Sequence, residues 1–198
     1  MKLFHLSDLH IGKRVNEFSM IEDQKYILKR ILDLAEEEKP DGIILAGDIY
    51  DKQIPSAEAV QVFDEFITRL AGRAIPVFII SGNHDSAERL AFGGRLLNSR
   101  GIYLSPVYDG SVTKIPLKDQ YGTVWIHLLP FIRPSTVRHV FENEADLVTD
   151  VQTAAETVIR HMEIDLKDRN ILVAHQFVTG ASRCESEDVQ VGGLDNID

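Results

Sequence analysis

Four short clusters of metal-binding residue types lie along the 198-residue chain, and each follows an apolar run. They are the segments 7–10 (SDLH), 47–48 (GD), 82–85 (GNHD) and 174–175 (AH). Carboxylate, amide and imidazole groups delivered from the ends of successive strands can hold two divalent metal ions close together. Such a pair activates water against a phosphoester. The residue types therefore predict phosphoester hydrolysis at a two-metal site.

The first two clusters offer three metal ligands. Asp8 and His10 project to the same side of an extended chain because they are two residues apart. This mixture of ligands suits manganese, iron or zinc better than calcium. Asp48 follows Gly47, whose conformational freedom lets the carboxylate project inward, where two metals could share it. The alternative is that these aspartates are turn residues and that His10 is a surface histidine. Asp51 could be either an acid that supports the site or a turn residue.

The third cluster is the most informative one, because asparagine, histidine and aspartate in a row after an apolar strand have no packing rationale. Asn83 offers a neutral amide oxygen to a metal already surrounded by carboxylates. His84 can bind a phosphate oxygen or protonate a leaving group, and Asp85 can hold the His84 ring in one tautomer. In the fourth cluster, His175 can serve the second metal. Alone it would more often be a structural histidine.

The composition is that of a globular protein and limits the other function classes. Hydrophobic residues make up 44% and charged residues 26% of the chain, and no apolar stretch is long enough for a membrane span. One cysteine allows no intrachain disulfide, which favours a cytoplasmic location. The net charge of −10 lowers the expectation of nucleic-acid binding without excluding it. The sequence contains neither a phosphate-binding Gly-x-x-x-x-Gly-Lys loop nor a Gly-x-Ser-x-Gly nucleophile motif.

The elements that must position these clusters alternate between short apolar runs and amphipathic stretches, which predicts an α/β layered domain. Strands are expected at 2–6, 42–46, 76–80, 124–129 and 171–174. Helical spacing joins Ile27, Ile31, Leu34 and Ala35, and it recurs from residue 57 to 70, with Ser56 as the N-cap. Further helices are expected at 86–98 and at about 146–162. The segment 102–129 is expected to form hairpins that begin a second sheet.

The four clusters resemble the motifs of the calcineurin-like metallophosphoesterase superfamily, which are D-x-H, G-D, G-N-H-D/E, H and G-H-x-H. The chain matches the first four motifs, and the fifth is absent. The phrases around them, such as residues 4–12 and 174–181, look like those of the SbcD-type nucleases. The resemblance implies a two-sheet sandwich flanked by helices. It also implies that residues 1–198 form one nuclease domain, incomplete at its C-terminus.

The resemblance also implies roles for the site residues. Asp8, His10 and a bridging Asp48 would hold one manganese ion. Asp48, Asn83 and His175 would hold the other. His84 would support the transition state or the leaving group, steadied by Asp85. Because the G-H-x-H pair is missing, each metal lacks one protein ligand, and we expect weakened metal binding and low activity for this chain.

Partners follow from the same resemblance. SbcD-type nucleases cut DNA as double-strand exonucleases and single-strand endonucleases in repair and recombination, together with a large SbcC-type ATPase. They tend to dimerise through the helices that here would be 57–70 and 86–98, with Phe66, Phe92 and Leu96 as candidate contacts. Two alternatives stay open. One is a phosphatase or cyclic-nucleotide phosphodiesterase on the same fold, and the other is a non-catalytic scaffold for the ATPase.

Overall fold

The computed structural model describes residues 1–178 together with Asn196 and Ile197. The strands are β1 (Leu3–Leu6), β2 (Arg14–Val15), β3 (Phe18–Ser19), β4 (Gly42–Ala46), β5 (Val77–Ile80), β6 (Ile102–Leu104), β7 (Thr113–Asp119), β8 (Gly122–Leu128), β9 (Arg169–Val173), β10 (Phe177–Val178) and β11 (Asn196–Ile197). The helices are α1 (Ile21–Glu38), α2 (Ala57–Gly72), α3 (Ala87–Leu90), α4 (Gly94–Leu97), α5 (Pro134–Val140) and α6 (Val151–His161), with 3-10 turns η1 (Asn98–Arg100) and η2 (Glu142–Leu147).

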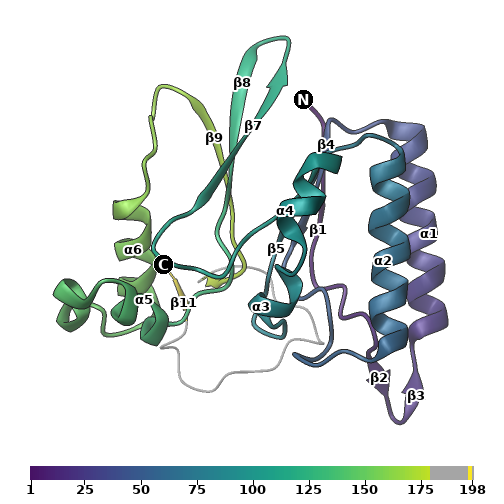
Figure 1. The fold of residues 1–198 in the computed structure, drawn as a ribbon, viewed down its shortest axis with the longest axis horizontal. Coiled ribbons are helices and arrows are strands. Elements are labelled where there is room, and N and C mark those ends of the chain that lie inside the picture. Colours follow the sequence, from purple (N-terminus) through teal and green to yellow (C-terminus); the bar gives the residue numbers. More distant parts are fainter. Residues whose placement is uncertain (179–195, 198) are drawn as a thin grey trace.

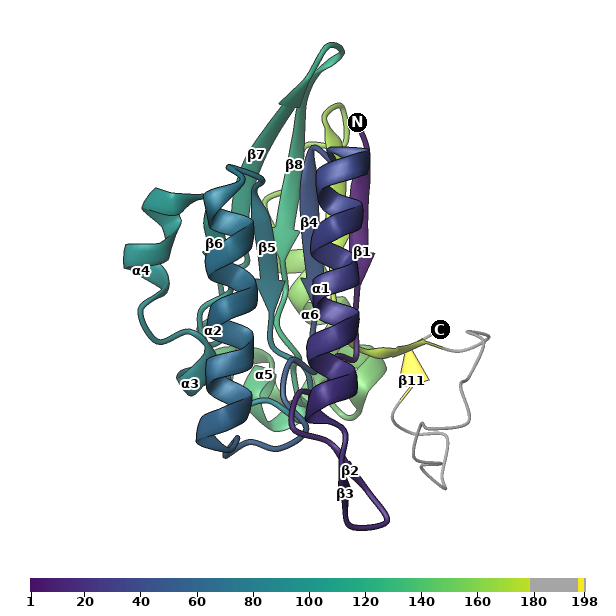
Figure 2. The ribbon, with the colours of Figure 1, turned by 90° about the vertical axis from the view of Figure 1, so that its right-hand side faces the viewer.

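The first layer is a four-stranded parallel sheet in the order β1-β4-β5-β6. All residues of β4 and β5 are buried, as expected for strands covered on both faces. Helices α1 and α2 lie side by side against one face of this sheet (Figures 1 and 2). Apolar side chains of both helices join the sheet in one core, among them Leu28, Leu32, Phe63 and Phe66. The carboxyl ends of β1, β4 and β5 meet at one edge, because parallel strands end on the same side.

The second layer is a three-stranded sheet in the order β7-β8-β9, and it packs on the other face of the first sheet. Strands β7 and β8 form an antiparallel hairpin, whereas β8 and β9 are parallel. Ile44 and Phe78 of the first sheet meet Ile126 and Val173 of the second in a shared core. Helices α5 and α6 pack together beside this sheet (Figure 1). The predicted two-sheet sandwich flanked by helices is confirmed.

The five predicted strands are confirmed within two residues at each end. Helix α2 begins after Ser56 as predicted, because the Ser56 hydroxyl accepts a hydrogen bond from the backbone N–H of Ala59 at 3.2 Å. Helix α1 also exists, but its buried face differs from the predicted one. Ile27 and Leu34 are 53% and 43% exposed, while Leu28 and Leu32 are buried. Helical spacing therefore predicted the element correctly, although two of the selected residues face solvent.

The predicted helix at 146–162 starts later than expected. Residues 142–147 form the turn η2, and helix α6 begins at Val151. Asp150 fixes this start through a capping box, because its carboxylate accepts from the Thr153 N–H at 2.8 Å and the Thr153 hydroxyl accepts from the Asp150 N–H at 3.1 Å. Local hydrogen bonding at Asp150 therefore overrides the apolar periodicity that extended the prediction backwards.

The predicted helix at 86–98 is broken into α3 and α4. Gly93 lies between them with a φ of +76°, a left-handed conformation that ends an α-helix. The burial of Phe66, in α2, corrects one of the expected dimer contacts. Phe66 is only 2% exposed and belongs to the core, whereas Phe92 and Leu96 are 87% and 79% exposed. Phe66 therefore does not lie on a surface that a second chain can reach.

The segment 102–129 contains one hairpin rather than several. Strand β6 pairs in parallel with β5 and completes the first sheet, and only β7 and β8 form a hairpin. Helix α5 was not predicted. Among the described residues, none of the helices combines the length and apolar character that crossing a bilayer requires. The polar, glycine-rich sequence of residues 178–198 has neither a helical nor a strand period and predicts an active-site loop. Apart from Val178 and β11, this stretch lies outside the described residues.

Candidate metal centre

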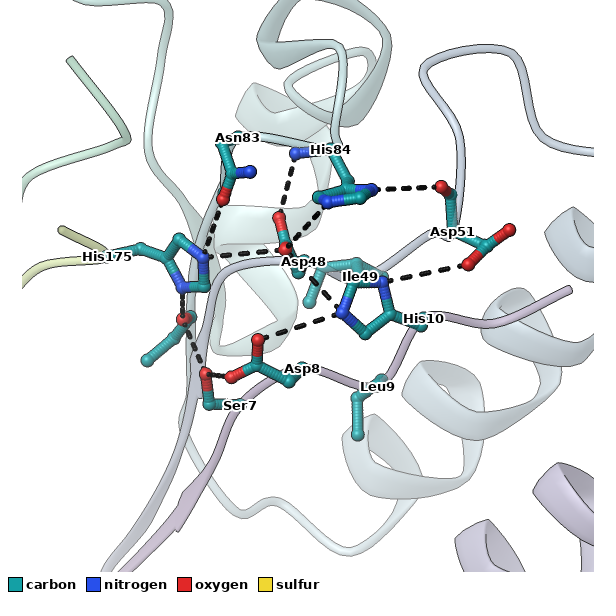
Figure 3. A network of polar contacts seen from close by, with 12 residues as sticks. Ser7, Asp8, Leu9, His10, Asp48, Ile49, Asp51, Asn83, His84 and His175 are labelled. Carbon is teal, nitrogen blue, oxygen red and sulfur yellow. Dashed lines mark hydrogen bonds and ion pairs between the residues drawn. The ribbon is translucent and has the colours of Figure 1, made fainter. Parts of the chain in front are cut away.

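The predicted site residues come together at the edge where β1, β4, β5 and β9 end. Asp8 and His10 follow β1, Asp48 follows β4, Asn83 and His84 follow β5, and His175 follows β9. Figure 3 shows these side chains converging on Asp48. Backbone hydrogen bonds hold the loops in register beyond the sheet, with the His10 N–H donating to the Asp48 carbonyl at 2.9 Å. The position of each of these side chains is therefore determined by the end of a strand and not by an unsupported loop.

Asp48 is the central residue of the site. Its Oδ2 atom lies 3.7 Å from Nε2 of His10, 3.5 Å from Nε2 of His175 and 4.0 Å from Nε2 of His84. Its other oxygen accepts a hydrogen bond from the backbone N–H of His84 at 2.9 Å. The Asp48 side chain is only 4% exposed. One buried carboxylate therefore faces three histidines from three different strands.

The backbone is strained where it presents the carboxylates and His10. Asp8, His10 and Asp48 have φ values of +57°, +42° and +49°, in the left-handed region that side chains other than glycine rarely adopt. Such strain costs about 1–3 kcal/mol for each residue, and it persists only where the surrounding structure enforces it. The hydrogen bonds between the two loops supply that enforcement. Four other residues that lie away from the site, Asn16, Glu17, Lys39 and Ala74, also have positive φ values, so the strain supports a functional role for the three site residues together with their convergence on one place.

Two glycines make room for the ligands. A Cβ atom on Gly47 would lie 2.5 Å from the His175 ring, and a Cβ atom on Gly82 would lie 2.1 Å from Oδ1 of Asp48. Real Cβ atoms essentially never approach so closely, so any larger residue would displace a ligand. The glycines in the G-D and G-N-H-D motifs are therefore steric requirements of the site.

His175 is held in an orientation that suits a metal ligand. Its Nδ1–H donates to the carbonyl of Ala46 at 2.7 Å, which leaves Nε2 directed into the site. There Nε2 lies 3.1 Å from Oδ1 of Asn83 and 3.5 Å from Oδ2 of Asp48. Both ring nitrogens of His175 thus face oxygen atoms. Burial alone would lower the pKa of His175, but the hydrogen bond and charge of Asp48, together with Ala46 and Asp8, raise it above its ordinary value.

Asp8 and His10 form the other side of the centre. Nε2 of His10 lies 3.7 Å from Oδ1 of Asp8 and equally far from Asp48. The interaction with His10 lowers the pKa of Asp8 to about 2, and the same pairing raises the pKa of His10. The Ser7 hydroxyl contacts Asp8 and lies 3.1 Å from the Ala46 carbonyl. Sequence reasoning did not select Ser7, which connects the Asp8 side of the centre to the His175 side.

His84 is oriented by Asp51, not by Asp85. Its Nδ1–H donates to the backbone carbonyl of Asp51 at 3.2 Å, so Nε2 points towards Asp48. The Asp51 carboxylate also lies 3.9 Å from Nδ1 of His10. This residue, which the sequence left undecided, therefore contacts both histidines (Figure 3). The rings of His10 and His84 meet edge to face, with their centroids 4.9 Å apart.

The expected contact between Asp85 and the His84 ring is not observed, which corrects the role predicted for Asp85. The carboxylate turns inward and accepts from three backbone N–H groups, those of Ile49 at 3.0 Å, Tyr50 at 2.9 Å and Gly82 at 2.9 Å. Burial is the main cause of its raised pKa. Asp85 therefore fastens the loop after β4 to the loop after β5, and it acts on the site through backbone position.

The donor set fits two divalent metal ions. Ligand atoms of Asp8, Asp48 and His175 lie within 4.8 Å of one another, and so do those of His10, Asp48 and His84. Asp48 belongs to both groups, as a bridging carboxylate must. Carboxylates with imidazoles and one amide oxygen suit manganese, iron or zinc. The sandwich and this site together define a metallophosphoesterase-like protein.

The chain belongs to the calcineurin-like phosphoesterase family, because the family model matches residues 1–192. Two relatives carry the name of the SbcD component of the nuclease SbcCD. The protein from Staphylococcus saprophyticus is 32% identical over 202 aligned residues, and the match covers 100% of this chain and 52% of the relative. The protein from Staphylococcus epidermidis is 34% identical with the same coverage. The chain thus spans about half the length of these relatives.

A solved structure of Yfce, a phosphoesterase from E. coli, also resembles the chain. The match covers 65% of this chain and 56% of that one, at 16% identity and a TM-score of 0.33. Similarity of that size supports no structural conclusion, so the fold assignment rests on the family match and on the observed topology.

Proposed function

We propose that this chain is the metal-binding part of a nuclease that hydrolyses DNA phosphodiester bonds with two divalent ions. The observation that supports this proposal most strongly is Asp48, whose buried carboxylate faces His10, His84 and His175 at 3.5–4.0 Å. A shared carboxylate between two groups of ligands is what a two-ion centre needs. The resemblance of the whole chain to proteins named as the SbcD component of the nuclease SbcCD supports DNA as the substrate.

The residues divide between the two ions. Asp8, His10 and Asp48 would hold one ion, and Asp48, Asn83 and His175 would hold the other. This division differs from the two groups of close ligand atoms described above, because it pairs Asp8 with His10, whose Nε2 lies 3.7 Å from Oδ1 of Asp8, and leaves His84 for the substrate. When bound, such ions activate water and neutralise charge on the phosphate, and manganese is the proposed metal. The Ala46 carbonyl fixes the His175 ring, and Ser7 and His10 keep Asp8 ionised, which preserves the negative charge that attracts cations.

His84 is proposed to act on the substrate itself. Its side chain is 40% exposed, more than those of His10 and His175, so a phosphodiester can reach it. Because Nδ1–H donates to the Asp51 carbonyl, Nε2 faces the site, and in the doubly protonated ring it can donate a hydrogen bond to a phosphate oxygen or a proton to the leaving-group oxygen. Asp85 positions this loop without touching the substrate.

The proposed partner is an SbcC-type ATPase, since the relatives are named as components of SbcCD. A homodimer is also proposed, through α2 and the 86–98 segment. The exposed side chains of Phe92 and Leu96 support this surface, and Phe66 is excluded from it by burial. The single cysteine remains the support for a cytoplasmic location. The missing fifth motif supports the expectation that residues 1–198 alone are weakly active.

A comparison of two substrates tests the proposed chemistry. The chain, and a longer form that extends to the length of the relatives, are incubated with manganese and either hairpin DNA or a small aryl phosphodiester. We expect the longer form to cut both substrates and the 198-residue chain to cut both more slowly. Hydrolysis of the small ester alone would favour a phosphatase or a cyclic-nucleotide phosphodiesterase. No hydrolysis of either substrate by either form would favour a scaffold.

A further inference from the structure

A pocket lies directly beside the candidate metal centre. It has a volume of about 380 Å³, and its walls come from the segment after β1, the β2–β3 hairpin, the start of α1 and the loop from residue 51 to the first turn of α2. Its apolar lining consists of Ile11, Ile21, Ile54 and Pro55. The volume falls in the range of about 300–1,000 Å³ that is typical of small-molecule sites. The pocket can therefore hold one small group.

Asp51 connects the pocket to the metal centre. Its side chain lines the pocket, its carboxylate lies 3.9 Å from Nδ1 of His10, and its carbonyl accepts from His84. Asp51 thus contacts both His10 and His84 on one side and forms part of the pocket wall on the other.

Two cationic side chains line the pocket, and one of them has no hydrogen-bond or ion-pair partner among the described residues. Arg14 and Lys52 both line it. Lys52 is exposed and forms neither an ion pair nor a hydrogen bond with any residue in the described part of the chain. A free ammonium beside an apolar wall matches a nucleotide, which combines an apolar base face with a phosphate.

We propose that this pocket binds the unpaired nucleoside attached to the scissile phosphate on the His84 side. The inference rests on the proposed nuclease function and specifies its substrate as DNA with an unpaired nucleotide at the cut. The base packs on Ile54 and Pro55, and Lys52 meets the next phosphate along the strand. An unpaired base costs the least free energy to bring out of a duplex, because it is not held by a partner.

Fluorescence binding measurements with a bulged duplex test the pocket without requiring turnover. One DNA carries a single bulged 2-aminopurine nucleotide, the other carries an abasic residue at the same place, and EDTA prevents cleavage. We expect the wild-type chain to bind the base-bearing bulge about four- to fifteenfold more tightly, the ratio expected when apolar surface equivalent to about one or two CH₂ groups is buried. The 2-aminopurine fluorescence should also change on binding.

The variant that tests the contact is Ile54→Asp. Ile54 is 73% exposed, so the substitution leaves the fold intact, which a thermal melt verifies. We expect this variant to bind both bulges with equal affinity. The matched control is Leu166→Asp, at a residue that is 91% exposed and absent from the pocket, and it should keep the wild-type ratio.

The outcomes separate this inference from the proposed function. A wild-type affinity ratio near one, or a ratio that Ile54→Asp leaves unchanged, would overturn the pocket as a nucleoside site. Hydrolysis of the aryl phosphodiester and of DNA is measured separately with the longer form. If that hydrolysis and DNA cleavage are both absent while the ratio is lost in Ile54→Asp, the hydrolytic function fails and the nucleoside site stands.

Discussion

Gly82 lies so close to Asp48 that no side chain fits between them. A Cβ atom built on Gly82 would lie 2.1 Å from Oδ1 of Asp48 and 2.3 Å from its backbone nitrogen. The loop after β5 therefore packs directly on the carboxylate that follows β4. This contact sets the position of Asp48 as firmly as the hydrogen bonds do.

Replacing Gly82 with alanine should displace Asp48. We expect Gly82→Ala to destabilise the metal-free chain by about 1–3 kcal/mol, the usual cost of forcing extra atoms into a packed region, and to weaken manganese binding. Urea unfolding and manganese titration measure the two effects. The matched control is Gly72→Ala in α2, because a Cβ atom there meets nothing within 4 Å. Equal behaviour of the two variants would contradict the steric argument.

Asp85 is predicted to be a structural anchor for two loops. In Asp85→Asn, an amide NH₂ replaces one carboxylate oxygen and cannot accept a hydrogen bond, so either the N–H of Tyr50 or those of Ile49 and Gly82 lose their acceptor. Leaving a buried donor unpaired costs about 1–3 kcal/mol. We therefore expect a loss of this size in the free energy of unfolding, measured in urea. Glu163→Gln, at an exposed site, should leave stability unchanged, and an equally stable Asp85→Asn would refute the anchoring role.

Manganese affinity should fall as the pH is lowered. The pKa values of His10 and His175 are raised in the metal-free chain, by the pairing with Asp8 and by Asp48 respectively. A proton must leave each ring before a metal binds, so affinity is highest above these raised pKa values and decreases below them. Calorimetric titration from about pH 5 to about pH 9, which brackets the ordinary histidine pKa of about 6.5, would show this dependence. His139→Ala should titrate like the wild type, and a pH-independent affinity would contradict the account.

The same groups give the metal-free chain a defined pH profile of stability. Raised histidine pKa values contribute stability that is full below the ordinary value and is lost as the pH rises through the raised values. Asp8 behaves in the opposite sense, since its contribution is present above the ordinary pKa of 3.8 and is lost as the pH falls towards about 2. Urea unfolding in EDTA at a series of pH values measures both the loss of stability at high pH and the loss at low pH (the acid limb). If Asp8→Asn left the acid limb unchanged, the assignment of that limb to Asp8 would be wrong.

The proposed dimer surface has its own test. Phe92 and Leu96 are largely exposed on the segment that contains α3 and α4. We expect the double variant Phe92→Glu and Leu96→Glu to shift a dimer to a monomer in sedimentation velocity, because two charges would be placed in an apolar interface. Leu166→Glu is the control at an exposed leucine elsewhere. A dimer that survives the double substitution would place the interface on another surface.

The sequence predicted the site better than the details of its support. The expectation that Asp8, His10, Asp48, Asn83 and His175 lie together was correct because ligand types directly after apolar strands identify one sheet edge, and their roles as metal ligands stay predictions. The role of Asp85 was wrong because its partners are backbone N–H groups, which leave no trace in residue types. The contact of Asp51 with His84 uses a carbonyl and is equally invisible in the sequence.

The same contrast between residue patterns and local backbone contacts explains which parts of the fold could be predicted. Strand positions were predictable because buried parallel strands are continuous apolar runs. The start of α6 and the break at Gly93 depend on capping and on a left-handed residue, and these local effects override apolar periodicity. Phe66 was assigned to an interface because helical spacing does not say which apolar residues face the core of the same chain.

The most direct test of the central claim is a manganese titration of Asp48→Asn beside His175→Ala. Because Asp48 belongs to both groups of ligands, we predict that Asp48→Asn weakens both manganese sites by at least about 100-fold, since loss of a merely supporting residue already costs about 10–100-fold. His175→Ala should weaken only one site. Retention of either site at wild-type affinity in Asp48→Asn would contradict the bridging role of Asp48 and the two-ion centre built on it.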